Sequence, residues 1–384
     1  MISKNPSLFI SSDFPPVSGG QSNFLFGLWT NLPPDETVIL APKVPGSNLI
    51  DRNLSCLTIR KKWPLGNNSI LKITKTFLIL IYVLKIRLNI NFKNLHCGQL
   101  FATGFVGLFL KKIIRLPYIL YVHGADLLEF KNKFLSGKVL RKILLNADKV
   151  IVNSKFTKTK VMETGVKPEI IKIINPGVSL EDFQTELDTE KFKKELNLEE
   201  KKIILTVSRL VERKGHDMVL SAMPKIIKEI SNVHYLILGD GPNKAKLKKM
   251  TEEIGLDNHV TFLGFIPDSE VPPYYAICDV FVMLSREIKE KGDVEGFGIV
   301  YLEANAMKKP VVAGKSGGVE DAVENGVNGL LVDPEDVDQI GRAIIRILKD
   351  DELRNKLGEK AYQRVKEKFD WKNRRDEFQF LLNI

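Results

Sequence analysis

Residues 202–242 read KIILTVSRLVERKGHDMVLSAMPKIIKEISNVHYLILGDGP. The apolar runs Ile203–Val207 and Tyr235–Leu238 each predict a buried strand, and the amphipathic stretch Asp217–Ile230 between them predicts a helix. The second run ends in Gly239-Asp240-Gly241-Pro242, which predicts a turn. A strand, a helix and another strand in this order are typical of the βαβ unit of a parallel sheet.

The same alternation of short apolar runs and longer amphipathic stretches continues on both sides of this unit. Further strand candidates are residues 7–11, 37–41, 54–59, 118–122, 149–152 and 172–174 before it, and residues 260–263, 280–284, 310–313 and 329–332 after it. We therefore predict an α/β protein with two Rossmann-like doubly wound domains, residues 1–180 and 181–365, facing across a cleft. A charged stretch from Glu352 to Leu382 predicts a closing helix.

The 384-residue chain has 44% hydrophobic and 27% charged residues. This composition excludes a disordered, collagenous or disulfide-scaffold protein. The net charge is +10, but residues 1–180 hold 25 Lys and Arg against 9 Asp and Glu, whereas the remainder holds 32 against 38. The basic first half predicts contact with an anionic partner, which could be nucleic acid, an anionic membrane or a phosphorylated ligand.

The cysteines and the apolar segments bear on the cellular compartment. Cys56, Cys97 and Cys278 are far apart and odd in number, which argues against a disulfide framework or a zinc site. The first residues lack the pattern of a signal peptide. The most apolar stretch, Phe77–Leu84, is much shorter than the roughly 20 residues that a membrane-spanning helix needs. We therefore expect a cytoplasmic protein without a spanning segment.

The loop after the first predicted strand contains Gly19-Gly20. Adjacent glycines before a helix allow backbone N–H groups to approach an anion at the helix N-terminus. The spacing is not that of the G-x-G-x-x-G dinucleotide motif. A phosphate-binding loop and a plain tight turn both remain open for this segment.

His123 directly follows the predicted strand Tyr118–Val122 and precedes Gly124. At the carboxyl end of a strand its ring could reach a ligand and donate to a sugar hydroxyl or a carbonyl. The alternative is a histidine whose ring is satisfied by local backbone. The remaining histidines have no comparable setting, and we expect them to be structural: His96, His216, His234 and His259.

Arg209 and Lys214 lie in the loop after the strand Ile203–Val207. An arginine fork and a lysine ammonium five residues apart could converge on one diphosphate and stabilise charge on a departing nucleoside diphosphate. The alternative is a solvated basic turn. The nearby glycines Gly239 and Gly241 predict a strand-to-helix turn that could line the same site.

The segment 293–303 reads DVEGFGIVYLE and carries two glutamates. Gly296 and Gly298 precede a predicted helix, residues 299–307, whose free N–H groups favour a phosphate. Glu295 in the loop could accept hydrogen bonds from sugar hydroxyls. Glu303 within the helix could bridge the two hydroxyls of a ribose.

Taken together, these pieces resemble the retaining glycosyltransferases of family 4, which have the two-domain GT-B fold. The matching features run in order along nearly the whole chain: Gly19-Gly20, His123-Gly124, residues 175–178, Arg209 with Lys214-Gly215, Gly239-Asp240-Gly241, Gly264-Phe265, Glu295 with Glu303, Gly317-Gly318 and residues 326–332. The branch that they resemble most is that of the GDP-mannose-dependent phosphatidylinositol mannosyltransferases.

The resemblance implies a role for each of these residues. Arg209 and Lys214 would bind the donor diphosphate, Glu295 the donor sugar and Glu303 the ribose. The backbone N–H groups would come from Phe297, Gly298 and Ile299, and the other donor-binding residues would be Gly19, Gly20, Gly241 and Phe265. His123 would act near the reacting sugar as a catalytic residue beside Arg209, Lys214 and Glu295. The C-terminal helix, residues 366–384, would cross back and pack on the first domain.

The resemblance also implies a metal-independent hexosyltransferase without a cofactor. It would move mannose from GDP-mannose to a hydroxyl of a glycan or glycolipid, by front-face attack with retention of configuration. The pattern Asp336-Val337-Asp338 resembles a metal motif, but it lies at a predicted helix start, where acidic residues favour the macrodipole. We interpret it as structural.

Other classes and partners follow from the same residues. The alternatives are a UDP-sugar-dependent transferase, a sugar epimerase or phosphorylase, a dinucleotide-dependent oxidoreductase, which lacks its glycine motif here, and a nucleic-acid-binding protein, which lacks an aromatic-basic motif. We expect no nucleic-acid partner. The basic half instead predicts peripheral contact with the inner face of an anionic membrane through residues 77–87, Lys111, Lys112 and Arg115, unless residues 77–84 simply form a core helix.

Overall fold

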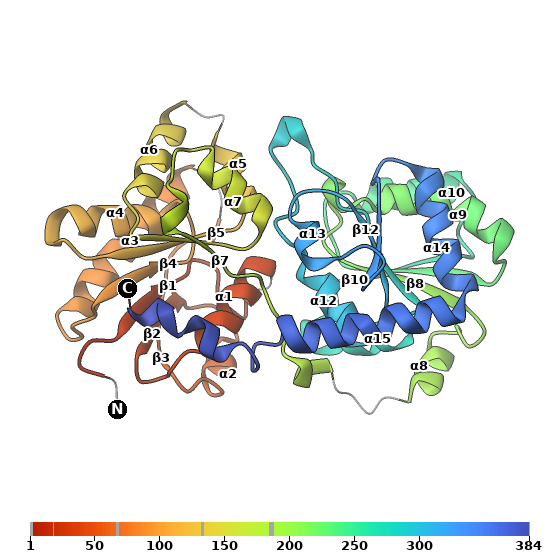
Figure 1. Ribbon diagram of the computed structural model, residues 1–384, viewed down its shortest axis with the longest axis horizontal. Helices are drawn as coiled ribbons and strands as arrows, with labels where there is room; N and C mark the ends of the chain where they lie inside the picture. The colour runs from red at the N-terminus through yellow and green to blue at the C-terminus, as the bar shows by residue number, and fades with distance from the viewer. Residues whose placement is uncertain (1–2, 18, 67–68, 132–133, 184–187, 384) are drawn as a thin grey trace. The chain divides into compact units, whose positions relative to one another are not determined.

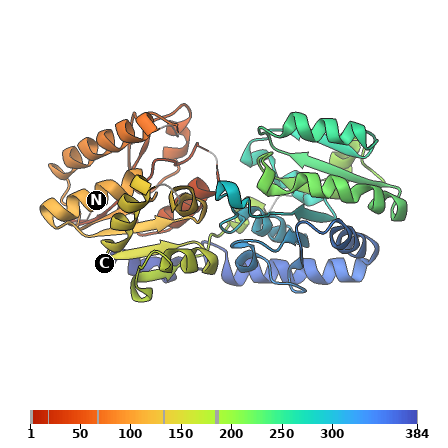
Figure 2. The same ribbon diagram turned by 90° about the horizontal axis from the view of Figure 1, so that it is seen from above.

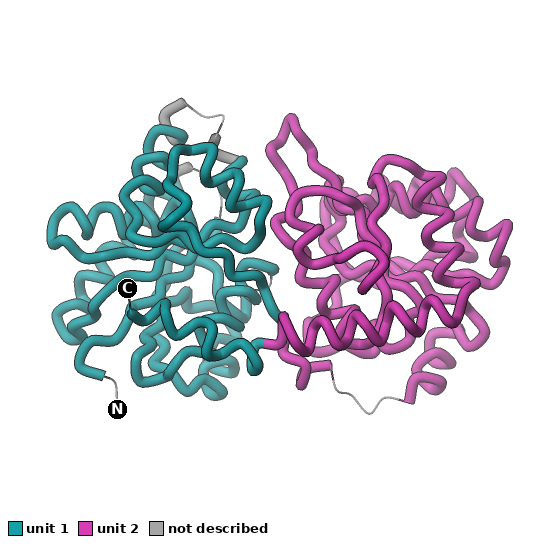
Figure 3. The backbone as a smooth tube through the Cα atoms, in the orientation of Figure 1, with its two compact units in different colours: residues 1–177, 371–384 teal, residues 178–370 magenta. Residues whose placement is uncertain are grey.

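A computed structural model describes residues 3–17, 19–66, 69–131, 134–183 and 188–383 (Figure 1). The chain divides into two compact units (Figure 3). The first unit contains residues 1–177 and 371–384, and the second contains residues 178–370. The C-terminal end of the chain therefore belongs to the first unit, as the resemblance implied.

The first unit is built on a seven-stranded parallel sheet with the strand order β3-β2-β1-β4-β5-β6-β7. Its strands are β1 (Ser7–Ile10), β2 (Thr37–Pro42), β3 (Leu57–Lys61), β4 (Asn94–Cys97), β5 (Tyr118–Val122), β6 (Lys149–Val152) and β7 (Ile171–Ile173). Its helices are α1 (Gly20–Thr30), α2 (Ser47–Asp51), α3 (Ser69–Arg87), α4 (Ala102–Ile114), α5 (Ala125–Lys131), α6 (Phe134–Leu145) and α7 (Lys155–Met162). The strand order reverses between β1 and β4.

The second unit repeats this architecture with six parallel strands in the order β10-β9-β8-β11-β12-β13. Its strands are β8 (Lys202–Val207), β9 (Val233–Leu238), β10 (Val260–Gly264), β11 (Val280–Met283), β12 (Val311–Gly314) and β13 (Gly329–Val332). Its helices are α8 (Thr189–Glu195), α9 (His216–Glu229), α10 (Lys244–Glu253), α11 (Pro272–Ile277), α12 (Ile299–Ala306), α13 (Val319–Ala322), α14 (Val337–Lys349) and α15 (Asp351–Lys368).

Helices cover both faces of each sheet (Figure 2), so the central strands are apolar on both sides. In β1, β5, β9 and β11 every residue is buried. Burial of a whole strand explains why these strands read as continuous apolar runs rather than as alternating ones. The prediction of two doubly wound α/β domains is confirmed.

One strand was not predicted from the sequence. β4 carries Asn94 and His96 among its four residues, so it lacks an apolar run. The His96 ring nevertheless stacks on Phe9 at 4.0 Å between ring centroids, and its Nδ1 lies 3.0 Å from the hydroxyl of Tyr121. The Tyr121 hydroxyl thus satisfies Nδ1 of this buried ring in the centre of the sheet, and burial lowers the pKa of His96 to about 3.

The predicted single helix from Glu352 to Leu382 is wrong in its second half. α15 ends at Lys368, and the chain continues into the 3₁₀ segment η6 (Arg375–Asn383). The helix stops because the Phe369 carbonyl accepts from the N–H of Val178, while Asp370 forms a β-bridge with the same residue. Past this point Trp371 packs 6.2 Å from the Phe24 ring in the first unit.

Candidate functional site

Lys214 and Glu295 form an ion pair in the second unit. Lys214 ends a 3₁₀ turn, η3 (Glu212–Lys214), in the connection from β8 to α9, and Glu295 lies in the loop that leads into α12. Lys214 Nζ lies 2.5 Å from Glu295 Oε2, and each residue is 9% exposed. β8 and β11 are the neighbouring strands at which the order of the second sheet reverses, and ligands of doubly wound sheets bind at this point.

Further groups surround the Glu295 carboxylate. Ser285 Oγ donates to Glu295 Oε2 at 3.4 Å, and Arg213 Nε lies 3.9 Å from the same oxygen. Arg213 is held in turn by Asp293, at 2.8 Å from Nη1 to Oδ1. Burial by itself raises the pKa of Glu295. The positive charges of Lys214 and, to a smaller extent, Arg213 lower it by more, so the pKa of Glu295 lies below its ordinary value. Glu295 is therefore a buried carboxylate that stays ionised.

The backbone around Glu295 depends on glycines. Gly298 has a φ of 91° and precedes α12, and a Cβ there would lie 2.5 Å from the ring of Tyr301. Gly317 has a φ of 56° and faces the Glu295 carbonyl, which accepts from the N–H of Gly318 at 2.9 Å. The first N–H groups of a helix have no intrahelical acceptor, and in α12 no side chain caps them either.

Phe297 and Ile299, predicted to offer backbone N–H groups, flank Gly298. The Phe297 side chain is 2% exposed and packs 6.0 Å from the Phe369 ring. It therefore fixes the loop in the core of the second unit, and only its backbone is free to contact a ligand.

Glu303 lies inside α12 and is half-buried. The buried hydroxyl of Tyr275 donates to Glu303 Oε2 at 2.7 Å. Burial raises the pKa of Glu303 to about 7, although the Tyr275 hydrogen bond opposes this shift. Near neutral pH this carboxyl group changes its charge easily, so a ligand that binds the carboxylate would promote loss of its proton.

Arg209, Gly241 and Phe265 lie at the same carboxyl edge of the second sheet. Arg209 is exposed, and its guanidinium has no partner among the residues that the structure describes. A Cβ on Gly241 would lie 2.6 Å from the Leu210 carbonyl, which shows that the two turns are closely packed. Phe265 follows β10 and is 65% exposed. Thus Arg209 and Phe265 are open to a ligand, whereas Lys214 is buried against Glu295.

His123 lies in the first unit, immediately after β5, and is 5% exposed. Its Nε2 lies 2.9 Å from the Gly98 carbonyl, and its backbone N–H donates to Asp126 Oδ1 at 3.0 Å. A carbonyl only accepts, so Nε2 carries a proton and the neutral ring presents Nδ1 as an acceptor. The expectation that His123 donates to a ligand therefore requires its protonated form or a break in the Gly98 contact.

Gly19 and Gly20 form the start of α1 in the first unit. Gly19 has a φ of 148°, and a Cβ on either glycine would have no neighbour within 4 Å. No side chain caps the helix. Packing does not require glycine at position 20, since its backbone is in an ordinary region and its surroundings are open.

Several site contacts were not predicted from the sequence. Ser285 and Arg213 contact Glu295, and Tyr275 contacts Glu303. Arg213 precedes Lys214 in the predicted basic loop, which was a usable signal. Ser285 follows β11 and Tyr275 lies in α11, and neither position has a motif that marks it.

The residues interpreted as structural have clear local roles. Asp336 caps α14 by accepting from the Gln339 N–H at 2.8 Å, and Asp338 pairs with Lys225 at 2.8 Å. His216 contacts Ser208, His234 contacts Thr261 and His259 contacts the Val233 carbonyl. The three cysteines are buried and unbonded.

Comparisons with known families and curated proteins match both units. Residues 188–364 match the family described as glycosyl transferases group 1, and residues 18–182 match glycosyltransferase family 4. An uncharacterised glycosyltransferase of Methanocaldococcus jannaschii is 31% identical over 289 residues, covering 73% of this chain and 72% of that protein. A GDP-mannose-dependent alpha-(1-6)-phosphatidylinositol monomannoside mannosyltransferase of Mycolicibacterium smegmatis is 27% identical over 369 residues, covering 96% of this chain and 95% of that protein.

Solved structures share the architecture. HepE of Anabaena in complex with UDP and glucose matches with a TM-score of 0.82 at 22% identity over 99% of both chains. Sucrose-phosphate synthase of Thermosynechococcus elongatus matches with a TM-score of 0.81 at 24% identity, over 99% of this chain and 98% of that one. These likenesses establish the fold.

Proposed function

Since this chain belongs to the family 4 glycosyltransferases, which have the GT-B fold and use nucleotide-sugar donors, we propose that it is a retaining mannosyltransferase. In this proposal it moves mannose from GDP-mannose to a hydroxyl of a glycan or glycolipid. The mannose donor and the lipid acceptor are supported by the relative from Mycolicibacterium smegmatis, which matches almost the full chain.

The observation that carries the proposal is the buried Lys214–Glu295 pair at the strand-order reversal of the second sheet. A lysine ammonium has three donors, so with one on Glu295 the others remain for a phosphate oxygen. Arg209 supplies a further cation, since its guanidinium has no partner within the described part of the chain. Together they stabilise the negative charge that develops on the diphosphate as it leaves.

The glutamates recognise the sugars of the donor. Glu295 stays ionised and accepts hydrogen bonds from the hydroxyls of the mannose, while Glu303 accepts from the hydroxyls of the ribose. The bond between the anomeric carbon and the phosphate oxygen breaks, and a bond to the acceptor oxygen forms on the same face of the sugar. The proton of the acceptor hydroxyl passes to the departing phosphate, and we propose that no metal or cofactor takes part.

A donor panel of GDP-mannose and several UDP-sugars tests the proposal, with product formation measured on glycan, polyol and phosphatidylinositol acceptors. We expect turnover with GDP-mannose and its loss in Lys214→Met. Lys225→Met is a matched control, because Lys225 pairs with Asp338 outside the site. Turnover of a UDP-sugar alone would contradict the mannose donor, and no turnover with any donor would contradict transferase activity.

A surface on α3 and α4 supports a membrane-bound acceptor. α3 buries Ile79 and Val83 in the core, as the alternative interpretation of residues 77–84 as a core helix requires. Its other face, the residue just past its end and the end of α4 are apolar and exposed, with large exposed side chains at Ile70, Ile73, Phe77, Leu84, Leu88, Ile113 and Ile114. We call this set the α3–α4 surface. An exposed apolar patch of this kind marks an interaction site.

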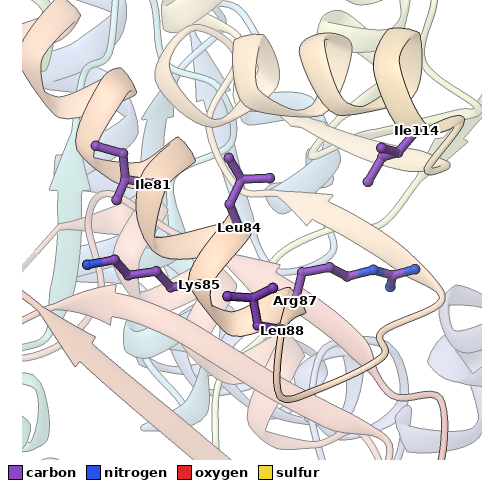
Figure 4. Close-up of a pocket in the computed structure, with 6 residues that line it drawn as sticks. All are labelled: Ile81, Leu84, Lys85, Arg87, Leu88 and Ile114. Atoms are coloured by element: carbon purple, nitrogen blue, oxygen red, sulfur yellow. The ribbon is translucent and has the colours of Figure 1, made fainter.

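The charges around the α3–α4 surface fit an anionic lipid bilayer. A hollow of about 510 Å³ is lined by Ile81, Leu84, Lys85, Arg87, Leu88 and Ile114. Figure 4 shows the two basic side chains beside the apolar ones. Lys112 and Arg115 are also exposed, whereas Lys111 pairs with Asp148 at 2.7 Å. Each free basic residue near an anionic surface contributes roughly 1 kcal/mol. No helix in the described ranges is long and apolar enough to cross a bilayer, and we propose peripheral contact.

Co-sedimentation with vesicles that contain anionic lipid tests this contact. We expect binding that weakens with salt and is lost in the double variant Phe77→Asp and Leu88→Asp. Leu49→Asp is the control, because Leu49 is 66% exposed on α2, outside the α3–α4 surface. Binding that is independent of anionic lipid, or retained in the double variant, would contradict the proposal.

A further inference from the structure

Tyr275 donates from the core of the second unit to a carboxylate at its surface. The Tyr275 hydroxyl lies 2.7 Å from Glu303 Oε2, and Tyr275 is 0% exposed, whereas Glu303 is half-buried. Glu303 Oε1 has no hydrogen-bond partner among the residues that the structure describes. The protein therefore holds one oxygen of this carboxylate and leaves the other available.

The Tyr275 hydroxyl is a fixed donor. Its ring, carried by α11, packs 6.2 Å from the Phe183 ring and 5.8 Å from the Phe281 ring, both measured between centroids. Burial, and after it the charge of Glu303, raises the pKa of Tyr275 well above its ordinary value. Because a tyrosine with a raised pKa keeps its proton at neutral pH, the hydroxyl always has a proton to donate to Glu303.

This hydrogen bond favours the ionised form of Glu303. Burial raises the pKa of Glu303 to about 7, and the bond from Tyr275 is the largest of the contributions that oppose burial. Two charged groups also act on the carboxylate: Asp268, which begins η4 (Asp268–Glu270), repels its charge, and Lys214 attracts it. Without the Tyr275 hydroxyl, Glu303 would keep its proton to higher pH.

The protonation state of Glu303 decides what the group can bind. An ionised carboxylate only accepts, so its two oxygens can take hydrogen bonds from two neighbouring hydroxyls, whereas a carboxylic acid uses one oxygen to donate. A ribose offers such a pair of hydroxyls at its 2′ and 3′ positions. α12 carries Glu303 and follows β11, so it begins at the carboxyl edge of the sheet, where doubly wound folds bind nucleotides.

We infer that Tyr275 is a positioning residue of the nucleotide site, whose hydroxyl holds the Glu303 carboxylate as a double acceptor for the 2′- and 3′-hydroxyls of the donor ribose. Tyr275 acts through Glu303 and does not touch the nucleotide. It thereby makes the site selective for a ribonucleotide over a deoxyribonucleotide. The inference rests on the proposed role of Glu303 at the ribose, but not on the identity of the base or of the transferred sugar.

Binding of GDP and of UDP to the full chain, measured by calorimetry between pH 6 and pH 9 without an acceptor, tests the inference. Tyr275→Phe removes one oxygen atom from the core. For the nucleotide that binds, we expect the dissociation constant to rise about tenfold at pH 7 and below, as for loss of a hydrogen bond to a charged group. The loss should shrink toward pH 9, where Glu303 ionises without the hydroxyl.

Tyr235→Phe is a matched control for the removal of a buried hydroxyl. Tyr235 is also 0% exposed and lies in the second unit, but its hydroxyl contacts Thr206 Oγ1 at 2.8 Å. Its affinity for the nucleotide should follow that of the wild type at every pH.

The 2′-deoxy form of the same nucleotide provides a second comparison. The wild type should bind the deoxyribonucleotide about tenfold more weakly than the ribonucleotide, because one hydrogen bond to a charged group is lost. Tyr275→Phe should bind the two forms with nearly equal affinity at pH 7. In a Glu303→Gln background, Tyr275→Phe should change neither affinity further.

The outcomes separate this inference from the proposed function. A loss in Tyr275→Phe that is equal at every pH, or that persists in the Glu303→Gln background, would make Tyr275 a structural residue and overturn the inference. Weaker binding in Glu303→Gln with unchanged binding in Tyr275→Phe would also overturn it, but would leave Glu303 at the ribose. Binding of neither nucleotide would overturn both roles. Because no sugar transfer is measured, failure of GDP-mannose as the donor would not affect the result.

Discussion

Lys214 Nζ lies 2.5 Å from Glu295 Oε2, although the two residues are 81 positions apart in the chain. The pair joins the β8–α9 connection to the loop before α12. Burial removes both charges from water, and the attraction between the two charges alone offsets this desolvation penalty poorly. Ser285 and Arg213 add further polar contacts to the same carboxylate. We interpret the pair as preorganised for a charged ligand rather than as a device for stability.

The first prediction concerns the stability of this pair. Lys214→Met leaves Glu295 as a buried carboxylate with Ser285 and the more distant Arg213 as its remaining partners, so the free energy of unfolding should fall by about 3 kcal/mol. Adding Glu295→Gln should restore about 1 kcal/mol or more, because no uncompensated charge remains at position 295. Chemical denaturation of the two single variants and the double variant measures the coupling.

The same variants separate stability from function. We expect the double variant to lack transfer activity, with a loss of about 100-fold or more in kcat, although it recovers stability. Recovery of both stability and activity would show that the pair serves only to hold the fold.

The second prediction concerns pH and Glu303. In the unfolded chain this carboxyl group has a pKa near 4.5, and burial raises its pKa to about 7 in the folded protein. Between these values the folded state holds a proton that the unfolded state has lost, so stability falls as the pH rises from about 4.5 to about 7. The contribution is roughly 1–3 kcal/mol after allowance for partial exposure. Comparison of denaturation curves of the wild type and Glu303→Gln across this range isolates it.

Donor affinity should show the opposite trend. If the ionised carboxylate binds the ribose, GDP affinity should rise as the pH passes through about 7 and should be weaker and independent of this titration in Glu303→Gln. Identical pH profiles for the two proteins would remove Glu303 from the donor site.

The third prediction concerns Gly298. Alanine at this position would have a φ of 91° and a Cβ 2.5 Å from the Tyr301 ring. Both effects oppose the native loop, so Gly298→Ala should destabilise the protein by about 1–3 kcal/mol and weaken GDP binding. Thermal denaturation and GDP titration measure the two effects, and a variant with wild-type stability and affinity would contradict this reading of the loop.

The fourth prediction concerns Gly20, for which the sequence left two interpretations open. Open space around this position means that Gly20→Ala should fold with wild-type stability or slightly more. A drop in kcat/KM in that stable variant would show that a ligand approaches the backbone there. Unchanged kinetics would leave the tight turn as the remaining interpretation of this loop.

The fold could be predicted from the sequence because most strands are buried on both faces. The runs that became β5, β9 and β11 contain only apolar residues or nearly so, and they were recognised. β4 was missed because His96 and Asn94 interrupt its pattern, and the burial of His96 depends on rings from β1 and β5. The break after Lys368 was missed because its cause, a bridge to Val178, lies almost two hundred residues away in the chain.

The site could be predicted in part. Glu295, Glu303 and Lys214 lie in sequence motifs, but Ser285 and Tyr275, which contact the two glutamates, do not. No pattern in the sequence reports that Lys214 points at Glu295, that Tyr275 donates to Glu303 or that His123 Nε2 is taken by the Gly98 carbonyl. These contacts depend on which loops the sheet brings together and on side-chain direction.

The most direct test of the central claim is transfer from GDP-mannose labelled at the anomeric carbon, followed by NMR of the product. The proposal predicts a mannosylated acceptor whose anomeric configuration is the same as that of the donor, with no product in Lys214→Met. A product of inverted configuration, or the absence of any mannosylated product across the acceptor panel, would contradict it.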